Sequence, residues 1–167
     1  LGIHVHLVEG RDRLLTFMDT ELIETLTRCM LAMEIDMHLP DEIEKVEASK
    51  KIQVHLKSGN IMKVDALLAA TGRSGDTLGM GLEEIGLETG RRGHLEVNDR
   101  YQTNVEHIYA AGDVIGFPAL ASTAMEQARI AMVHAFNLKY KTELATILPY
   151  GIYTIPECSM AGKTEEE

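Results

Sequence analysis

Two acidic side chains, Glu9 and Asp113, each follow an apolar segment of the kind that forms a strand. Before Glu9, the apolar residues Ile3, Val5 and Leu7 alternate with polar ones, so we expect Glu9 at the carboxyl end of a strand. A carboxylate at that position can accept hydrogen bonds from both hydroxyls of an adenosine ribose, and it repels a 2′-phosphate. Glu9 is therefore a candidate ligand for the ribose of a dinucleotide.

Two arginines lie close to Glu9 in the sequence and complicate this charge argument. The guanidinium of Arg11 or Arg13 can pair with a 2′-phosphate through two parallel hydrogen bonds. Glu9 thus favours a nucleotide without that phosphate, whereas Arg11 favours one that carries it. The residues by themselves leave both NAD(H) and NADP(H) open as ligands.

A second apolar segment comprises residues 107–111. Gly112 follows it, and Asp113 comes directly after Gly112. We expect a buried strand here, which would place Asp113 at the carboxyl edge of a sheet, where α/β proteins bind ligands. Gly112 would let a ligand approach the backbone closely, so that the carboxylate can hold a polyol hydroxyl.

The helix expected after Asp113 offers further polar groups to the same ligand. Thr123 and Glu126 have the spacing of a capping box at its start. The free N–H groups near Ser122 would carry about +0.5 of a charge, which suits an electron-rich oxygen. The apolar residues expected to face inward from this helix are Met125, Met132, Val133 and Phe136.

Other patterns fall short of their motifs. Gly162-Lys163-Thr164 resembles the end of a phosphate-binding P-loop, but Glu157 stands where the first glycine of that loop belongs. Gly79-Met80-Gly81 is followed by Glu84 rather than glycine, so the chain contains no GxGxxG motif.

His4 and His6 share one face of the first strand and could ligate a metal, but no third ligand has a suitable spacing. We expect half-exposed structural histidines and predict no metal site.

The elements that would position these residues indicate a mixed α/β chain. Asp19 is the expected N-cap of a helix that ends near residue 33, and a short strand follows at 35–39. The alternation of apolar residues predicts an antiparallel meander over 43–64, then a buried strand at 65–70. Seven glycines between residues 72 and 93 indicate an irregular crossing and a domain boundary near residue 72. A last strand is expected at 152–155.

The composition excludes several classes of protein. With 167 residues the chain is about one domain long, and its formal net charge of −10 argues against nucleic acid as a partner. No apolar stretch reaches the roughly 18 residues that a membrane span requires. Cys29 and Cys158 lie far apart in the sequence, in no metal-binding or redox spacing, which favours a reducing compartment such as the cytoplasm.

Short motifs along the chain occur in the order and spacing of a known family. Together they resemble the pyridine nucleotide-disulfide oxidoreductases, which are flavoproteins that bind two dinucleotides, and the resemblance covers essentially the whole chain. The motifs are Ala69-Ala-Thr-Gly-Arg73, Ile85-Gly-Leu-Glu88, Val97, Gln102-Thr103, Ile108-Tyr-Ala-Ala-Gly-Asp113, Gln127, Ile152-Tyr-Thr-Ile-Pro-Glu157 and Gly162-Lys-Thr-Glu165.

This resemblance implies a division into parts of three domains. Residues 1–72 would form an NAD(P)-binding, Rossmann-like domain with a β-meander, lacking its first βα unit. Residues 73–145 would be the C-terminal part of an FAD-binding domain, and residues 146–167 the start of an α+β dimer-interface domain. The chain would then be an internal fragment of a homodimeric enzyme, beginning just after a GxGxxG turn.

The resemblance also implies what several residues bind. Asp113 would accept a hydrogen bond from a ribitol hydroxyl of FAD, and the N–H groups of Leu120, Ala121 and Ser122 would face the flavin N1 and C2 carbonyl. Gly72, from the first motif, joins these cofactor-binding residues. Glu9 and Arg11 would bind the nicotinamide coenzyme. No catalytic side chain is assigned, because Cys29 and Cys158 cannot replace the redox cysteine pair of disulfide-reducing relatives.

Within the family, Gly72-Arg-Ser-Gly-Asp-Thr77 and Arg11-Asp-Arg-Leu-Leu15 are most similar to the transhydrogenase branch. That branch implies hydride transfer between NADPH and NAD through bound FAD. The alternatives are a disulfide reductase of the dihydrolipoamide dehydrogenase kind, and a fragment that is not catalytic by itself. Two features depart from the branch: Ala128 stands where many relatives have glycine, and Glu9 is a choice typical of NAD-binding proteins.

Overall fold

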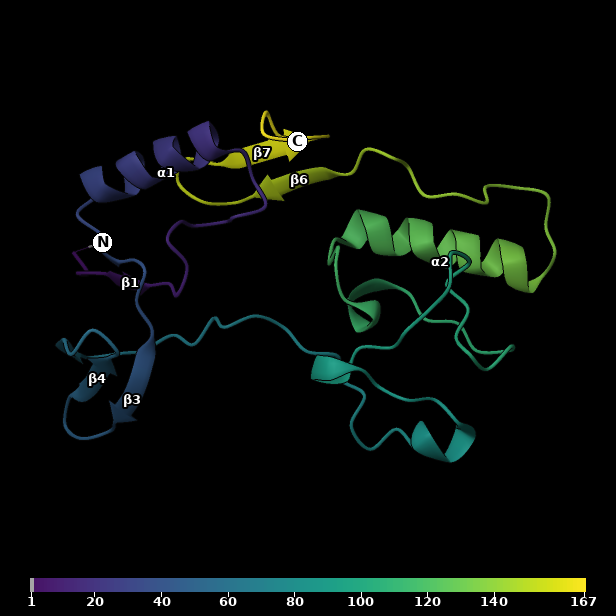
Figure 1. Ribbon diagram of the computed structural model, residues 1–167, viewed down its shortest axis with the longest axis horizontal. Helices are drawn as coiled ribbons and strands as arrows, with labels where there is room; N and C mark the ends of the chain where they lie inside the picture. The colour runs from purple at the N-terminus through teal and green to yellow at the C-terminus, as the bar shows by residue number, and fades with distance from the viewer. Residues whose placement is uncertain (1) are drawn as a thin grey trace. The chain divides into compact units, whose positions relative to one another are not determined.

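The computed structural model describes residues 2–167, which form two compact units (Figure 1). The first unit joins residues 2–70 to residues 149–167, and the second comprises residues 71–148. Both contain helices and short extended segments, and the predicted mixed α/β class is confirmed.

None of the helices formed within residues 2–167 has the length and apolar character needed to cross a lipid bilayer.

The first unit is organised around a β-α-β element. Strand β1 (His6–Val8) pairs in parallel with β2 (Asp36–His38), and helix α1 (Thr20–Ala32) connects them. In the register, His6 lies opposite Asp36 and Leu7 opposite Met37. All three elements were expected, and the two strands are shorter than predicted.

Helix α1 begins where the sequence predicts, because the Asp19 side chain caps it by accepting from the backbone N–H of Glu21 at 3.0 Å. The other carboxylate oxygen of Asp19 accepts from the N–H of Glu165, near the end of the chain, at 3.1 Å. Buried side chains from α1, the segment before it and the C-terminal hairpin form the core: Leu14, Met18, Ile23, Leu26 and Cys158.

The two faces of the β1–β2 pair differ in character. Leu7 and Met37, which are register partners, pack against this core. Since neighbouring residues of a strand point to opposite faces, His6 and Asp36 lie on the face away from the core. One face of the pair is thus apolar, and the other carries histidine and aspartate.

The predicted meander is confirmed as three antiparallel strands: β3 (Ile43–Glu47), β4 (Ile52–Leu56) and β5 (Ile61–Val64). The central strand buries Val54 and Leu56 on one face. After the meander, the expected buried strand at 65–70 is wrong, because these residues are exposed and irregular. No strand among residues 2–167 pairs with them, so their backbone groups have no ladder to join.

At the C-terminus, β6 (Pro149–Ile152) and β7 (Cys158–Ala161) form an antiparallel hairpin. The strand expected at 152–155 is therefore displaced toward the N-terminus, and Tyr153 and Ile155 are exposed in the connecting loop. Pro156 lacks an N–H to donate to a ladder, which is consistent with a loop at this position.

The second unit contains little regular structure besides helix α2 (Ala121–Ala135). Three short 3₁₀ helices, η1 (Glu83–Ile85), η2 (Arg91–Gly93) and η3 (Gly112–Ile115), interrupt an otherwise irregular chain. The irregular character predicted for residues 72–93 is thus confirmed. The strand expected at 107–111 is wrong: within the part of the chain that the structure describes, this segment makes a single bridge, between Tyr109 and Gln102.

Helix α2 buries a different set of side chains from the one predicted. Of the four apolar residues expected inside, Val133 is buried, whereas Met125, Met132 and Phe136 are at least half exposed. The buried residues are Thr123, Gln127, Ile130, Ala131 and Val133. The 3₁₀ helix η3 packs against α2, and the buried residues of α2 include the polar side chains of Thr123 and Gln127.

The double role of Asp19 is testable by substitution. Asp19→Ala removes both the cap of α1 and the acceptor for Glu165, so we expect the free energy of unfolding to fall by about 1–2 kcal/mol. Asp19→Asn retains one acceptor oxygen, so it should recover the part of the loss due to the helix cap but not the part due to the bond from Glu165. Urea denaturation followed by circular dichroism measures both changes, and equal losses would contradict a capping role.

Candidate functional site

Glu9 lies where the sequence predicts, directly after β1 at the carboxyl end of the parallel pair. Its backbone continues the ladder: the N–H donates to the carbonyl of His38 at 3.2 Å, and the carbonyl accepts from the N–H of Asp41 at 2.9 Å. The half-buried carboxylate accepts from the N–H of Arg11 through Oε1 at 3.0 Å. The position of this carboxylate is therefore fixed by the sheet and by its own turn.

The two nearby arginines have different surroundings. The guanidinium of Arg13 donates to the hydroxyl of Thr20 at the start of α1 and, at 3.2 Å, to the carbonyl of Thr16 in the segment before the helix. The side chain of Arg11 is exposed beside Glu9. Of the two guanidinium groups, that of Arg11 is the one open to solvent beside Glu9.

Asp113 lies at the start of η3, and its carboxylate pairs with Arg73 at 2.6 Å between Nη2 and Oδ2. Both side chains are partly open to solvent, with 44% of the Asp113 side chain exposed. Gly72 directly precedes Arg73 and has φ of +101°, a conformation that favours glycine. The structure thus brings the segment that contains Gly72 to Asp113. It adds Arg73 to the candidate site, whereas the sequence analysis named this residue only as part of a motif.

Gly112, the residue before Asp113, packs closely against helix α2. Its N–H donates to the buried Oε1 of Gln127 at 2.7 Å. A Cβ at Gly112 would lie 3.2 Å from the Cβ of Ala124, and φ is +80°. The close contact and the backbone conformation both favour glycine here. Gln127, which occurs among the sequence motifs, thus has a structural role in placing Asp113.

The start of α2 has no side-chain cap, so the predicted capping box is wrong. Leu120 is the N-cap residue, Thr123 is buried inside the first turn, and Ala121 and Ser122 are exposed. Glu126 instead pairs with Lys141 and Arg129, which lower the pKa of its carboxyl. Because a helix leaves its first N–H groups without intrahelical partners, this end can receive an electron-rich group.

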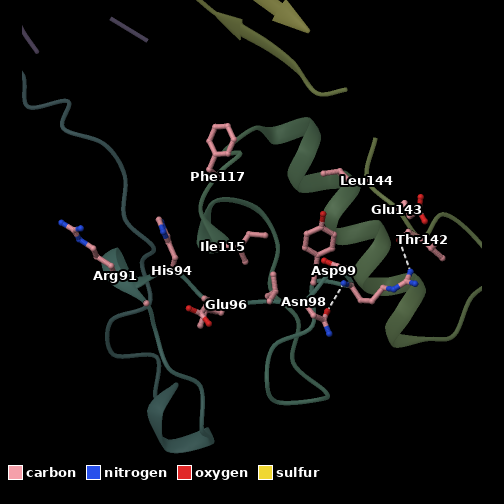
Figure 2. A pocket seen from close by; sticks show the side chains of 15 residues that line it. Arg91, His94, Glu96, Asn98, Asp99, Ile115, Phe117, Thr142, Glu143 and Leu144 are labelled. Carbon is pink, nitrogen blue, oxygen red and sulfur yellow. Dashed lines mark hydrogen bonds between the residues drawn. The ribbon is translucent and has the colours of Figure 1, made fainter. Parts of the chain in front are cut away.

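A hollow of about 900 Å³ also lies in the second unit, lined by the loop at 90–101, by residues around η3 and by residues 142–144 (Figure 2). Figure 2 shows His94 and Thr142 on opposite sides of it. None of the residues predicted to bind a cofactor lines this hollow. The predicted site and the hollow are therefore different features.

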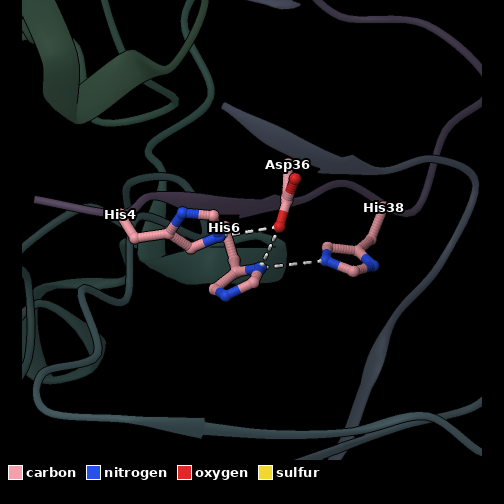
Figure 3. A network of polar contacts seen from close by, with 4 residues as sticks. All are labelled: His4, His6, Asp36 and His38. Carbon is pink, nitrogen blue, oxygen red and sulfur yellow. Dashed lines mark hydrogen bonds and ion pairs between the residues drawn. The ribbon is translucent and has the colours of Figure 1, made fainter. Parts of the chain in front are cut away.

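Four polar side chains meet on the outer face of β1 and β2 (Figure 3). Nε2 of His4 lies 2.8 Å from Oδ2 of Asp36, Nδ1 of His6 lies 3.4 Å from the same oxygen, and His38 lies 3.3 Å from His6. The hydrogen bond with His4 is the main cause that lowers the pKa of Asp36. Sequence reasoning found the two N-terminal histidines but not their partners on β2.

Comparison with known proteins gives a family and several relatives. The family described as "Pyridine nucleotide-disulphide oxidoreductase" matches residues 1–128. The chain is 47% identical over 168 residues to the soluble pyridine nucleotide transhydrogenase of Colwellia psychrerythraea, and 46% identical to that of Yersinia enterocolitica. Both alignments cover 100% of this chain and 36% of the relative, so the chain spans about a third of the length of these relatives.

The fold of this chain also matches solved structures. The HOCl-induced flavoprotein disulfide reductase RclA of Escherichia coli matches with a TM-score of 0.88 at 27% identity, covering 99% of this chain and 38% of that one. LpdA of Mycobacterium tuberculosis matches with a TM-score of 0.85 at 28% identity, covering 95% and 35%.

The contact between Gly112 and α2 can be tested with a matched pair of variants. Gly112 and Gly86 both have φ of +80°, but a Cβ at Gly86 meets nothing within 4 Å. Gly86→Ala should lower the free energy of unfolding by about 1–2 kcal/mol, the cost of a left-handed backbone at alanine. Gly112→Ala should cost roughly 1 kcal/mol more because it also crowds Ala124. Equal losses in denaturant titrations would show that the close approach to α2 is unimportant.

Proposed function

Because the chain belongs to the pyridine nucleotide-disulphide oxidoreductase family, we propose that it is an internal part of a flavoprotein that transfers hydride between NADPH/NADP and NADH/NAD through bound FAD. The observation that carries this proposal is the 46–47% identity, over the whole chain, to proteins named soluble pyridine nucleotide transhydrogenase. The arrangement of Glu9 and Asp113 supports it.

We assign residues 73–145 to the C-terminal part of the FAD-binding domain. The donor set suits this cofactor: the partly exposed carboxylate of Asp113 can accept from a ribitol hydroxyl, and the uncapped start of α2 can donate to electron-rich flavin atoms. Gly112, held by Gln127, keeps the two groups together. FAD, when bound, supplies the hydride-accepting and hydride-donating chemistry, and these residues bind and orient it.

Residues 1–72 are assigned to the nicotinamide coenzyme. Glu9 is anchored in the β1–β2 ladder and would accept from the adenosine ribose hydroxyls. The exposed guanidinium of Arg11 beside it would pair with the 2′-phosphate of NADP(H). An acidic and a basic group at one strand end suit a protein that uses both coenzymes.

A second candidate, an NAD-linked disulfide reductase, is favoured by the structural similarity to a flavoprotein disulfide reductase. Two rates of the full-length enzyme distinguish these functions. One is hydride transfer from NADPH to an NAD analogue with a shifted absorbance, and the other is reduction of lipoamide. Disulfide reduction without transfer between nucleotides would overturn the transhydrogenase proposal.

The remaining partners follow from this assignment. We propose that residues 146–167 begin a dimer-interface domain, that the full-length enzyme is a homodimer, and that it acts in the cytoplasm. The ligands are small nicotinamide coenzymes rather than nucleic acid, consistent with the net charge of −10.

The role of Glu9 is tested in the full-length enzyme. Glu9→Ala should weaken NAD(H) binding by about 1.5–3 kcal/mol, or roughly 10- to 150-fold, because hydrogen bonds to a charged group are lost. NADP(H) should lose less or gain, since a negative charge near its phosphate is removed. Arg11→Ala should give the reverse pattern. Equilibrium fluorescence titrations measure both, and equal losses of both coenzymes in Glu9→Ala would indicate a purely structural carboxylate.

The role of Asp113 is tested by flavin content. Asp113→Ala should lower the ratio of flavin absorbance to protein absorbance in the purified enzyme and raise the FAD dissociation rate, with an unchanged circular dichroism spectrum. Asp99→Ala, which removes another exposed carboxylate of the same unit, is the matched control and should retain FAD. Full flavin with an unchanged dissociation rate in Asp113→Ala would refute the assignment.

A further inference from the structure

The histidine cluster on the outer face of β1 and β2 carries an inference that is independent of the coenzyme sites. We propose that His4, His6 and Asp36 bind a divalent late transition-metal ion of the Zn²⁺ type, with His38 flanking the site beside His6 (Figure 3). Among residues 2–167 this is the one group of three or more potential ligands whose donor atoms converge, all three lying within 4.8 Å of one another.

The backbone places these ligands together. His6 is the first residue of β1, and Asp36 is its register partner across the parallel ladder. His4 lies two residues before β1, and its Nε2 reaches the same Asp36 oxygen at 2.8 Å. His38 lies two residues beyond Asp36 on the same face. The two segments His4-x-His6 and Asp36-x-His38 therefore direct four side chains to one patch, and three of them converge.

The distances between donor atoms are close to those of a metal site. Bond lengths of about 2.0–2.1 Å to Zn²⁺ require ligand atoms roughly 3.3 Å apart in a tetrahedron. The nitrogen of His6 already lies 3.4 Å from Oδ2 of Asp36. The nitrogen of His4, at 2.8 Å from Asp36, must move outward by about half an ångström to admit an ion.

The chemistry of the donors selects the class of ion. Two imidazole nitrogens and one carboxylate oxygen suit Zn²⁺, Ni²⁺ or Cu²⁺, whereas Mg²⁺ and Ca²⁺ prefer oxygen ligands. The His4 and Asp36 side chains are more than half exposed, so an ion can enter from solvent. His6, which is three-quarters buried, would form the inner wall of the site.

The proposed site is separate from the coenzyme site. Glu9 is three residues beyond His6, which corresponds to about 10 Å along an extended strand. An ion bound by β1 and β2 would cross-link the two strands without contacting a nucleotide at their carboxyl ends. Metal binding should therefore stabilise the first unit and leave coenzyme binding unchanged.

The experiment uses the full chain in a Cys29→Ser background, which excludes binding of the probe to that half-buried thiol. After chelation and dialysis, the protein is titrated with Zn²⁺ by calorimetry and with Co²⁺ by visible absorbance, which reports the coordination geometry. We expect one equivalent of Zn²⁺ and a rise in melting temperature on binding. Circular dichroism checks that each variant is folded.

The variants distinguish specific Zn²⁺ binding at this cluster from nonspecific Zn²⁺ binding to exposed histidines. His4→Gln, His6→Gln and Asp36→Asn should each weaken Zn²⁺ binding about tenfold or more, and His38→Gln should weaken it less. His107→Gln, which changes an exposed histidine outside the cluster, should bind as the parent does. His4→Gln changes the more exposed ligand and keeps the test valid if His6→Gln does not fold. Absence of saturable binding, or equal affinity in all variants, would overturn the proposal.

Discussion

The parallel pairing of β1 with β2 is the constraint on which the first unit depends. Its register sets Leu7 opposite Met37 on the face that packs against the core below α1. The same alternation directs His6 and Asp36 to the other face, and the direction of the strands places Glu9 at their carboxyl ends. Core packing and the proposed metal ligands are thus consequences of one register, and the proposed ribose ligand is a consequence of the parallel direction of the strands. A slip of one residue would exchange the two faces of a strand and remove the first two together.

The second unit is organised by a polar contact rather than by a sheet. Gln127 is buried in the middle of α2 and accepts from the N–H of Gly112, so the backbone of η3 is joined to the helix by a hydrogen bond in a buried environment. A buried amide left without that partner would destabilise the unit by about 1–3 kcal/mol. This contact keeps Asp113 and the start of α2 in a defined relation even though no strand supports them.

Sequence reasoning succeeded where local signals decide the structure. Asp19 marks the start of α1, and alternation marks the three strands of the meander. It failed where an element depends on neighbours distant in the sequence. The segments at 65–70 and 107–111 have the apolar composition of buried strands but lack adjacent strands among residues 2–167. Likewise, Arg73 and Asp36 join their sites only through tertiary contacts with Asp113 and the N-terminal histidines, although the Asp36-x-His38 spacing was a readable signal.

Cys158 lies in the same core as Ile23 and Leu26, and Glu165 donates to Asp19 across a separation of 146 positions. The first unit is therefore discontinuous in sequence, whereas the second is a single uninterrupted segment. During synthesis on the ribosome, residues 71–148 are all made before the hairpin that contributes Cys158 to the first core. Closing so long a loop carries an entropic cost that local contacts do not. The topology thus implies that all residues of the second unit are made before the first unit acquires the β6–β7 hairpin.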